Sequence, residues 1–133
     1  MDLLERLRQH AASLSEVKLA VLFGSTARGQ ARKGSDVDLG LLLDPDTRSV
    51  RLHVEADLAR AAQHEVDVVY LNEAPPLLRF EITRDGILIF EREEGLWTLS
   101  KVKAMVDWWD WAPIARRINR TMIQHLRERV SDG

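Results

Sequence analysis

Two aspartates at the start of an apolar segment are the residues of this sequence whose types and spacing most directly indicate chemistry. Asp36 and Asp38 are separated by one residue, and the apolar run VDLGLLL occupies residues 37–43. On a strand, residues two apart project from the same face, with α-carbons roughly 7 Å apart. Two such carboxylates can bind hard divalent cations, and Mg²⁺ takes one or two carboxylates together with phosphate oxygens and water. The pair therefore predicts a metal site for a phosphorylated substrate.

A glycine–serine pair upstream has the chemistry of a phosphate-binding loop. Gly24 and Ser25 follow directly after the apolar run VKLAVLF at residues 17–23. A residue without a β-carbon lets backbone amides approach a phosphate closely, and the Ser25 hydroxyl can donate a further hydrogen bond. If a short helix begins at Ser25, its dipole also favours the anion. We expect these residues to bind phosphates of the same substrate.

A third acid lies inside a later apolar segment. Asp67 is the third residue of EVDVVYL, residues 65–71. Burying a carboxylate in a strand without a partner is costly. A metal ion or the proton of an acceptor group would explain a charge at this position.

Together these residues resemble the motif of the nucleotidyltransferase superfamily that includes DNA polymerase β, and specifically its minimal branch. That motif is a glycine–serine pair, about ten residues, and then aspartate-x-aspartate, which Gly24-Ser25 and Asp36-Val37-Asp38 match. A lone aspartate-x-aspartate is a weak signal, whereas the pair, the spacing and the flanking apolar runs together are specific. The resemblance covers roughly residues 15–92.

The resemblance implies a role for each matching residue. It implies that Asp36 and Asp38 hold two Mg²⁺ ions against a nucleoside triphosphate, and that Asp67 completes the metal site and helps to deprotonate the acceptor. Gly24 and Ser25 would bind the β- and γ-phosphates. Two further positions match the longer form of the motif and are assigned to nucleotide binding, namely Arg28 and Ser35.

The minimal branch also suggests an acceptor. Its members are commonly the antitoxins of pairs whose toxin is a helical HEPN ribonuclease, and they transfer AMP from ATP to a tyrosine of that toxin. The chain resembles these antitoxins in length and motif, which implies ATP as donor and a HEPN-type toxin as partner and acceptor. Two alternatives stay open: transfer to a small molecule such as an aminoglycoside, and a non-catalytic antitoxin that neutralises the toxin by binding.

Length and composition restrict the number of domains, the possible metal ligands and the classes of partner. A chain of 133 residues fits one domain and leaves little room for a separate acceptor-binding domain. The net charge of −2 argues against direct nucleic-acid binding, and with no cysteine any metal must be held by oxygen or histidine ligands. The N-terminal residues lack the apolar run of a signal peptide or membrane span, so we expect no membrane association and a cytoplasmic protein.

The pattern of apolar residues predicts the elements that position these side chains. It favours a layered α/β (α+β) fold with a small mixed sheet of about four strands flanked by helices, which is the polymerase β-like fold that the resemblance implies. Strands are expected at 17–23, 37–43, 65–71 and 87–91, and helices at about 2–14 and 48–63. A third helix is expected to start where Asn72 is followed by Pro75 and Pro76, and to end at Gly86. Because Pro113 should interrupt a helix, the C-terminal region is predicted to form a helical pair, 94–109 and 111–130.

The C-terminal region is rich in tryptophan. Tryptophans at helical spacing usually pack in a core, but Trp108, Trp109 and Trp111 are too close together to face one core. At least one of them should meet solvent or a partner. A basic run begins at Arg116, and a solvated helix face explains it as well as an acidic partner does.

Overall fold

The computed structural model of the chain describes residues 1–27 and 37–132. Its elements, in chain order, are α1 (Leu3–Ser13), β1 (Val17–Phe23), α2 (Gly24–Ala27), β2 (Val37–Leu43), α3 (Arg48–Ala62), β3 (Val66–Tyr70), α4 (Pro76–Asp85), β4 (Ile87–Glu91) and α5 (Leu96–Asp132). Among these residues, none of the helices combines the length and apolar character needed to cross a bilayer.

The four strands form one mixed sheet in the order β3-β2-β1-β4. β1 pairs antiparallel with both β2 and β4, whereas β2 pairs parallel with β3. A parallel pair needs a crossover connection, and α3 provides it. The predicted mixed sheet and the helix expected at 48–63 are therefore confirmed, and the predicted strand at 65–71 is shorter by one residue at each end.

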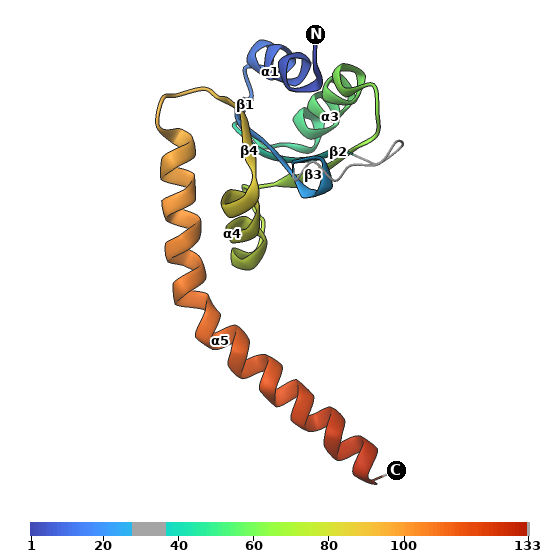
Figure 1. The fold of residues 1–133 in the computed structure, drawn as a ribbon, viewed down its shortest axis with the longest axis vertical. Helices are drawn as coiled ribbons and strands as arrows, with labels where there is room; N and C mark the ends of the chain where they lie inside the picture. The colour runs from blue at the N-terminus through green and yellow to red at the C-terminus, as the bar shows by residue number, and fades with distance from the viewer. Residues whose placement is uncertain (28–36, 133) are drawn as a thin grey trace.

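Each face of the sheet is covered by its own set of helices. Figure 1 shows α1 and α3 on one side of the sheet and α4 on the other, with α5 extending away from it. The larger core lies under α1 and α3 and includes Leu7, Leu39 and Leu58, each 1% exposed. On the α4 side, Ile82 packs with Leu19 and Val21 of β1. Burial of each large aliphatic side chain contributes roughly 1.5–3 kcal/mol, so both faces are held firmly.

The helix boundaries follow local signals. Asp2 accepts a hydrogen bond from the Glu5 N–H at 2.9 Å, and Thr47 accepts one from the Val50 N–H at 3.2 Å. Each side chain satisfies an N–H that the first turn of a helix leaves without a partner. Gly86 ends α4 where a β-carbon would lie 2.4 Å from the Ile82 carbonyl oxygen, so only glycine fits without displacement. This end of α4 was predicted correctly.

The predicted C-terminal helical pair is wrong. α5 is one helix from Leu96 to Asp132 with Pro113 inside it, and its axis changes direction part-way along (Figure 1). Proline removes one backbone N–H donor and crowds the preceding turn, which kinks a helix without necessarily ending it. Asp110, which lies between the two predicted helices, is an exposed residue of the helix interior.

Arg92, directly after β4, makes hydrogen bonds at the end of α1 and the start of β1. Its guanidinium donates hydrogen bonds to the carbonyl oxygens of Ala11, Ala12 and Leu14 at 3.1, 3.3 and 2.8 Å, and to that of Val17 at 3.1 Å. The last carbonyls of a helix have no partner within the helix, and an arginine side chain can supply one. Arg92 thus ties the end of α1 and the start of β1 to the end of β4.

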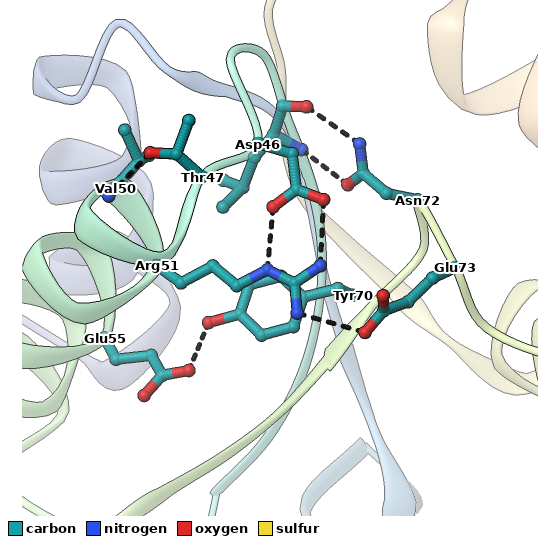
Figure 2. Close-up of polar contacts among 9 residues, drawn as sticks. Asp46, Thr47, Val50, Arg51, Glu55, Tyr70, Asn72 and Glu73 are labelled. Atoms are coloured by element: carbon teal, nitrogen blue, oxygen red, sulfur yellow. Dashed lines mark hydrogen bonds and ion pairs between the residues drawn. The ribbon is translucent and has the colours of Figure 1, made fainter.

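A polar cluster around Arg51 joins α3 to the loop before it, to the end of β3 and to the loop after β3 (Figure 2). Arg51 donates two hydrogen bonds to Asp46, at 2.7 and 2.8 Å, and one to Glu73 at 3.0 Å. Its guanidinium carbon lies 3.9 Å from the centre of the Tyr70 ring, and the Tyr70 hydroxyl donates to Glu55. The sequence analysis did not foresee this cluster, whose hydrogen bonds lower the pKa of Asp46.

The lowered pKa of Asp46 predicts a stability difference that depends on pH. The contribution of ionised Asp46 to the free energy of unfolding should be complete above its unfolded-state pKa of about 4. It should be lost as pH falls through the lower folded-state pKa. We expect the urea midpoints of wild type and Asp46→Asn to differ most at about pH 6 and to converge toward about pH 3. In an Arg51→Met background the same substitution should have no pH-dependent effect. A wild-type advantage that stays equal at both pH values would contradict the assignment.

Candidate functional site

The turn from β1 into α2 packs directly against Asp38. Phe23, the last residue of β1, pairs with Asp38 of β2, so Gly24 follows at the side of that carboxylate. Gly24 has φ +74°, and a β-carbon there would lie 2.2 Å from Oδ2 of Asp38 and 3.0 Å from its Cγ. Any other residue would combine backbone strain with a clash against the acid. Close approach of a phosphate was the reason expected for glycine at position 24, and the contact with Asp38 was not expected.

Asp38 and Asp67 lie opposite each other on neighbouring strands. They are direct partners in the parallel pairing of β2 with β3. Neighbouring strands are about 4.8 Å apart, and paired residues project from the same face, so the two carboxylates leave the sheet side by side. The next position on that face, Gly40, lies against Ile82 of α4. The acids therefore project on the α4 side of the sheet.

Side chains along β2 point alternately to the two faces of the sheet, and this places Asp38 on the face away from the core under α1 and α3. Val37 and Leu39, on either side of Asp38, are 2% and 1% exposed and belong to the core under α1 and α3. Val37 therefore points to the face opposite Asp38. A strand with one face buried has a fixed register, which holds Asp38 at the opposite face.

The expectation that Asp67 is a buried charge is wrong. Asp67 is exposed, because β3 is an edge strand of the sheet and this residue lies near its start. Its position is therefore not explained by the cost of burying a carboxylate. What distinguishes Asp67 is its pairing with Asp38.

Part of the predicted site lies outside the described residues. Asp36, Arg28 and Ser35 belong to the segment 28–36, and of Ser25 only the backbone is described, within α2. The short helix considered at Ser25 is present and begins at Gly24. The roles assigned to these four side chains stay predictions.

The donor set that the structure does place suits a hard divalent cation. Carboxylates on two neighbouring strands offer oxygen ligands, and Mg²⁺ binds proteins through one or two carboxylates plus phosphate oxygens and water. Within residues 1–27 and 37–132, three or more acids or histidines do not gather at any one point. Asp36, which the sequence analysis assigned to the same site, lies outside the described residues.

The tryptophans of α5 divide as the sequence analysis expected. Trp108 stacks on Phe80 of α4, with ring centres 6.0 Å apart. Trp109 is 63% exposed. At least one of the clustered tryptophans therefore meets solvent, and Trp108 joins α5 to α4.

Comparison with known proteins places this geometry in a family. The family model described as "Polymerase beta, Nucleotidyltransferase" matches residues 5–95. No curated protein was found to match the sequence.

Several solved structures share the fold. A toxin–antitoxin crystal structure with AMP-PNP is 23% identical, covers 90% of this chain and 98% of that chain, and has a TM-score of 0.74. A variant of the toxin–antitoxin MntA–HpeT is 25% identical over 89% and 93% of the two chains, with a TM-score of 0.67. A tri-AMPylated Shewanella oneidensis HEPN toxin in complex with an MNT antitoxin gives 21% identity, coverage of 90% and 98%, and a TM-score of 0.65.

Proposed function

Because the chain belongs to the polymerase β nucleotidyltransferase family, we propose that it transfers AMP from ATP to a hydroxyl of a partner protein. The partner we propose is a HEPN-type toxin, with a tyrosine as acceptor and this chain as antitoxin. The observation that carries the proposal is the pairing of Asp38 with Asp67 where Gly24 packs against Asp38. Similar solved structures contain AMP-PNP or an AMPylated HEPN toxin, which supports the choice of donor and acceptor.

Each residue of the site has a task in this proposal. Asp36, Asp38 and Asp67 hold two Mg²⁺ ions, which when bound neutralise the triphosphate and make the acceptor hydroxyl easier to deprotonate. The backbone at Gly24 and the Ser25 hydroxyl hold the β- and γ-phosphates, with Arg28 and Ser35 contributing further contacts. The chain itself therefore supplies both the anion-binding and the cation-binding halves of the site.

The proposed reaction is a displacement at the α-phosphorus. The acceptor oxygen forms a bond to that phosphorus while the bond to the bridging oxygen breaks, and pyrophosphate leaves with the bonding electrons. Asp67 takes the acceptor proton. It suits this role better than Asp38, because Asp67 is exposed at the edge strand whereas Asp38 is half-buried against Gly24. An acceptor on another protein can reach the exposed carboxylate.

The chain's own tyrosine is badly placed to be the acceptor. Tyr70 is the only tyrosine in the sequence, is 9% exposed, and donates its hydroxyl hydrogen bond to Glu55. Burial and the nearby carboxylate of Glu55 raise the pKa of Tyr70, so the hydroxyl keeps its proton. We infer that the acceptor tyrosine belongs to the partner.

Labelled nucleotides test the proposal. The chain is incubated with α-labelled ATP, GTP, CTP or UTP and Mg²⁺, with and without a HEPN-type protein from the same genome. We expect label on the HEPN-type protein, with ATP only, and the same result with Tyr70→Phe. Label on neither protein would reject protein AMPylation, in favour of a small-molecule acceptor such as an aminoglycoside or of an antitoxin that acts by binding alone.

A further inference from the structure

The first half of α5 exposes a line of large apolar side chains. Leu99, Val102, Val106 and Trp109 are 64%, 53%, 46% and 63% exposed. Their spacing of three, four and three residues places them along one side of a helix over about 15 Å. We call these four residues the α5 stripe. Single exposed apolar residues are ordinary, but a continuous line of them marks an interaction surface.

Packing against α4 fixes the direction in which the stripe faces. On the other side of α5, Ala104 is 2% exposed and Trp108 stacks on Phe80. Asp107 also accepts a hydrogen bond from Arg79 of α4 at 2.8 Å. These contacts occupy one side of the helix, so the stripe is held on the side that no described element covers.

The spacing of the stripe is that of a helix–helix seam. Alternating steps of three and four residues are the a and d positions of a heptad, which pack against the side chains of a second helix. The same pattern would continue at residues 113 and 116, which are Pro113 and Arg116. The seam therefore ends after two heptads and fits one short helix.

A hollow beside the stripe adds a place for an anchoring side chain. Leu99 and Lys103 of α5 line a hollow of about 200 Å³, together with Leu42 of β2, Leu71 directly after β3, and Arg79 and Thr83 of α4. Apolar walls beside a lysine suit a large apolar side chain with an acidic neighbour. Side chains that fill such pockets at the centre of an interface carry most of its binding energy.

The charge of α5 distinguishes between possible occupants. α5 holds seven lysines and arginines against four acids, whereas the rest of the chain holds twelve against seventeen. This excess lies past the stripe: residues 96–112 hold two lysines and two aspartates, whereas residues 113–132 hold five arginines and two acids. A second copy packed in parallel would bring the two basic segments together, which disfavours that pair. A helix from a different protein is complementary when its apolar face meets the stripe and its acidic residues lie toward Arg116. RNA would match the charge, but it would leave the aliphatic side chains without apolar partners.

We propose that the α5 stripe is the docking surface for a helix of the HEPN-type partner, with an apolar face against the stripe and acidic residues beyond it, toward Arg116. The identity of this partner rests on the proposed function. Docking here is separate from the transfer site along the strands: Leu42 and Leu71, which line the hollow, lie at the ends of β2 and β3, whereas Asp38 and Asp67 lie near the starts of these strands.

Two stripe variants and a matched control test the docking surface. Trp109→Glu and Val102→Glu each place a carboxylate in the seam, and Leu52→Glu places one at a residue of α3 that is 59% exposed. Calorimetric titration with the HEPN-type protein, without ATP, should show at least about tenfold weaker binding for the stripe variants. Leu52→Glu should stay within about twofold of wild type. All three should keep wild-type helicity and thermal stability.

Separate readouts keep the docking surface and the transfer reaction distinguishable. Label transfer by the stripe variants should fall at low partner concentration and recover at saturating concentration. Stripe variants that bind as tightly as wild type would overturn the docking proposal even if transfer occurs. If the stripe variants bind more weakly but wild type itself transfers no label, the docking proposal is supported and the proposed reaction is rejected. Wild type that binds no HEPN-type protein, or that self-associates in sedimentation through Trp109, would also overturn docking.

A charge-reversal variant tests the acidic character of the partner. Arg116→Glu combined with Arg120→Glu leaves the stripe intact and changes two exposed residues of α5. We expect about tenfold slower association at low salt and a weaker dependence of the association rate on salt, because complementary charge acts mainly on that rate. An unchanged rate and salt dependence would overturn the acidic-partner assignment.

Discussion

Replacing Asp38 by asparagine is expected to lower nucleotide transfer at least about a thousandfold while the protein stays folded. An amide of the same shape carries no charge to hold a divalent cation, and a loss of roughly 4 kcal/mol of transition-state stabilisation corresponds to that factor. The fold should persist because Asp38 projects on the face opposite Val37 and Leu39, which remain in the core. Initial rates of label transfer and thermal unfolding measure the two parts of this prediction.

The control for Asp38 lies at the other end of the same strand. Asp44 directly follows β2 and is exposed, so Asp44→Asn should keep wild-type activity. The double variant Asp36→Asn/Asp38→Asn should have no measurable transfer. Substantial activity in that double variant would eliminate the proposed mechanism.

Gly24→Ala should be almost as damaging to activity, for a different reason. The added β-carbon would lie 2.2 Å from Oδ2 of Asp38 at a backbone φ of +74°. The carboxylate or the turn must move, and displacement of a site by about 1 Å can cost about a hundredfold in rate. Strain from the left-handed backbone adds roughly 1–2 kcal/mol to the loss of stability. Transfer rates and urea unfolding measure both effects.

Gly95 offers a matched control for this substitution. Its φ is +90°, but a β-carbon there would meet no described atom within 4 Å. Gly95→Ala should therefore lose stability through backbone strain and keep its transfer rate. If Gly24→Ala and Gly95→Ala reduced transfer equally, the contact between Gly24 and Asp38 would not explain the effect.

The strands of this protein are predictable because their signals are local. Continuous apolar runs gave the bounds of β1, β2 and β4 as the structure has them. α5 was wrongly divided because Pro113 predicts a helix end. A proline removes one backbone hydrogen bond, and that loss alone does not end a helix. The helical turns on both sides continue past that loss.

The site was only partly predictable because its geometry depends on pairing between distant segments. The chemistry of Asp38 and Asp67 can be read from the sequence, but their alignment follows from the register of β2 with β3. The same limit explains why Asp67 was expected to be buried, since a sequence does not mark β3 as an edge strand. The contact of Gly24 with Asp38 and the cluster around Arg51 also join residues far apart along the chain.

The contacts of Arg92 bear on how the protein is made. Synthesis proceeds from the N-terminus, so α1 and β1 leave the ribosome well before β4 and Arg92. Until then β1 has β2 as a neighbour on one side and an open edge on the other, and the last carbonyls of α1 lack the guanidinium that satisfies them. The contacts made by α1 and β1 are therefore complete only once residues 87–92 have been synthesised. We expect nascent chains that end before residue 87 to need protection from aggregation, because the edge of β1 is then unpaired.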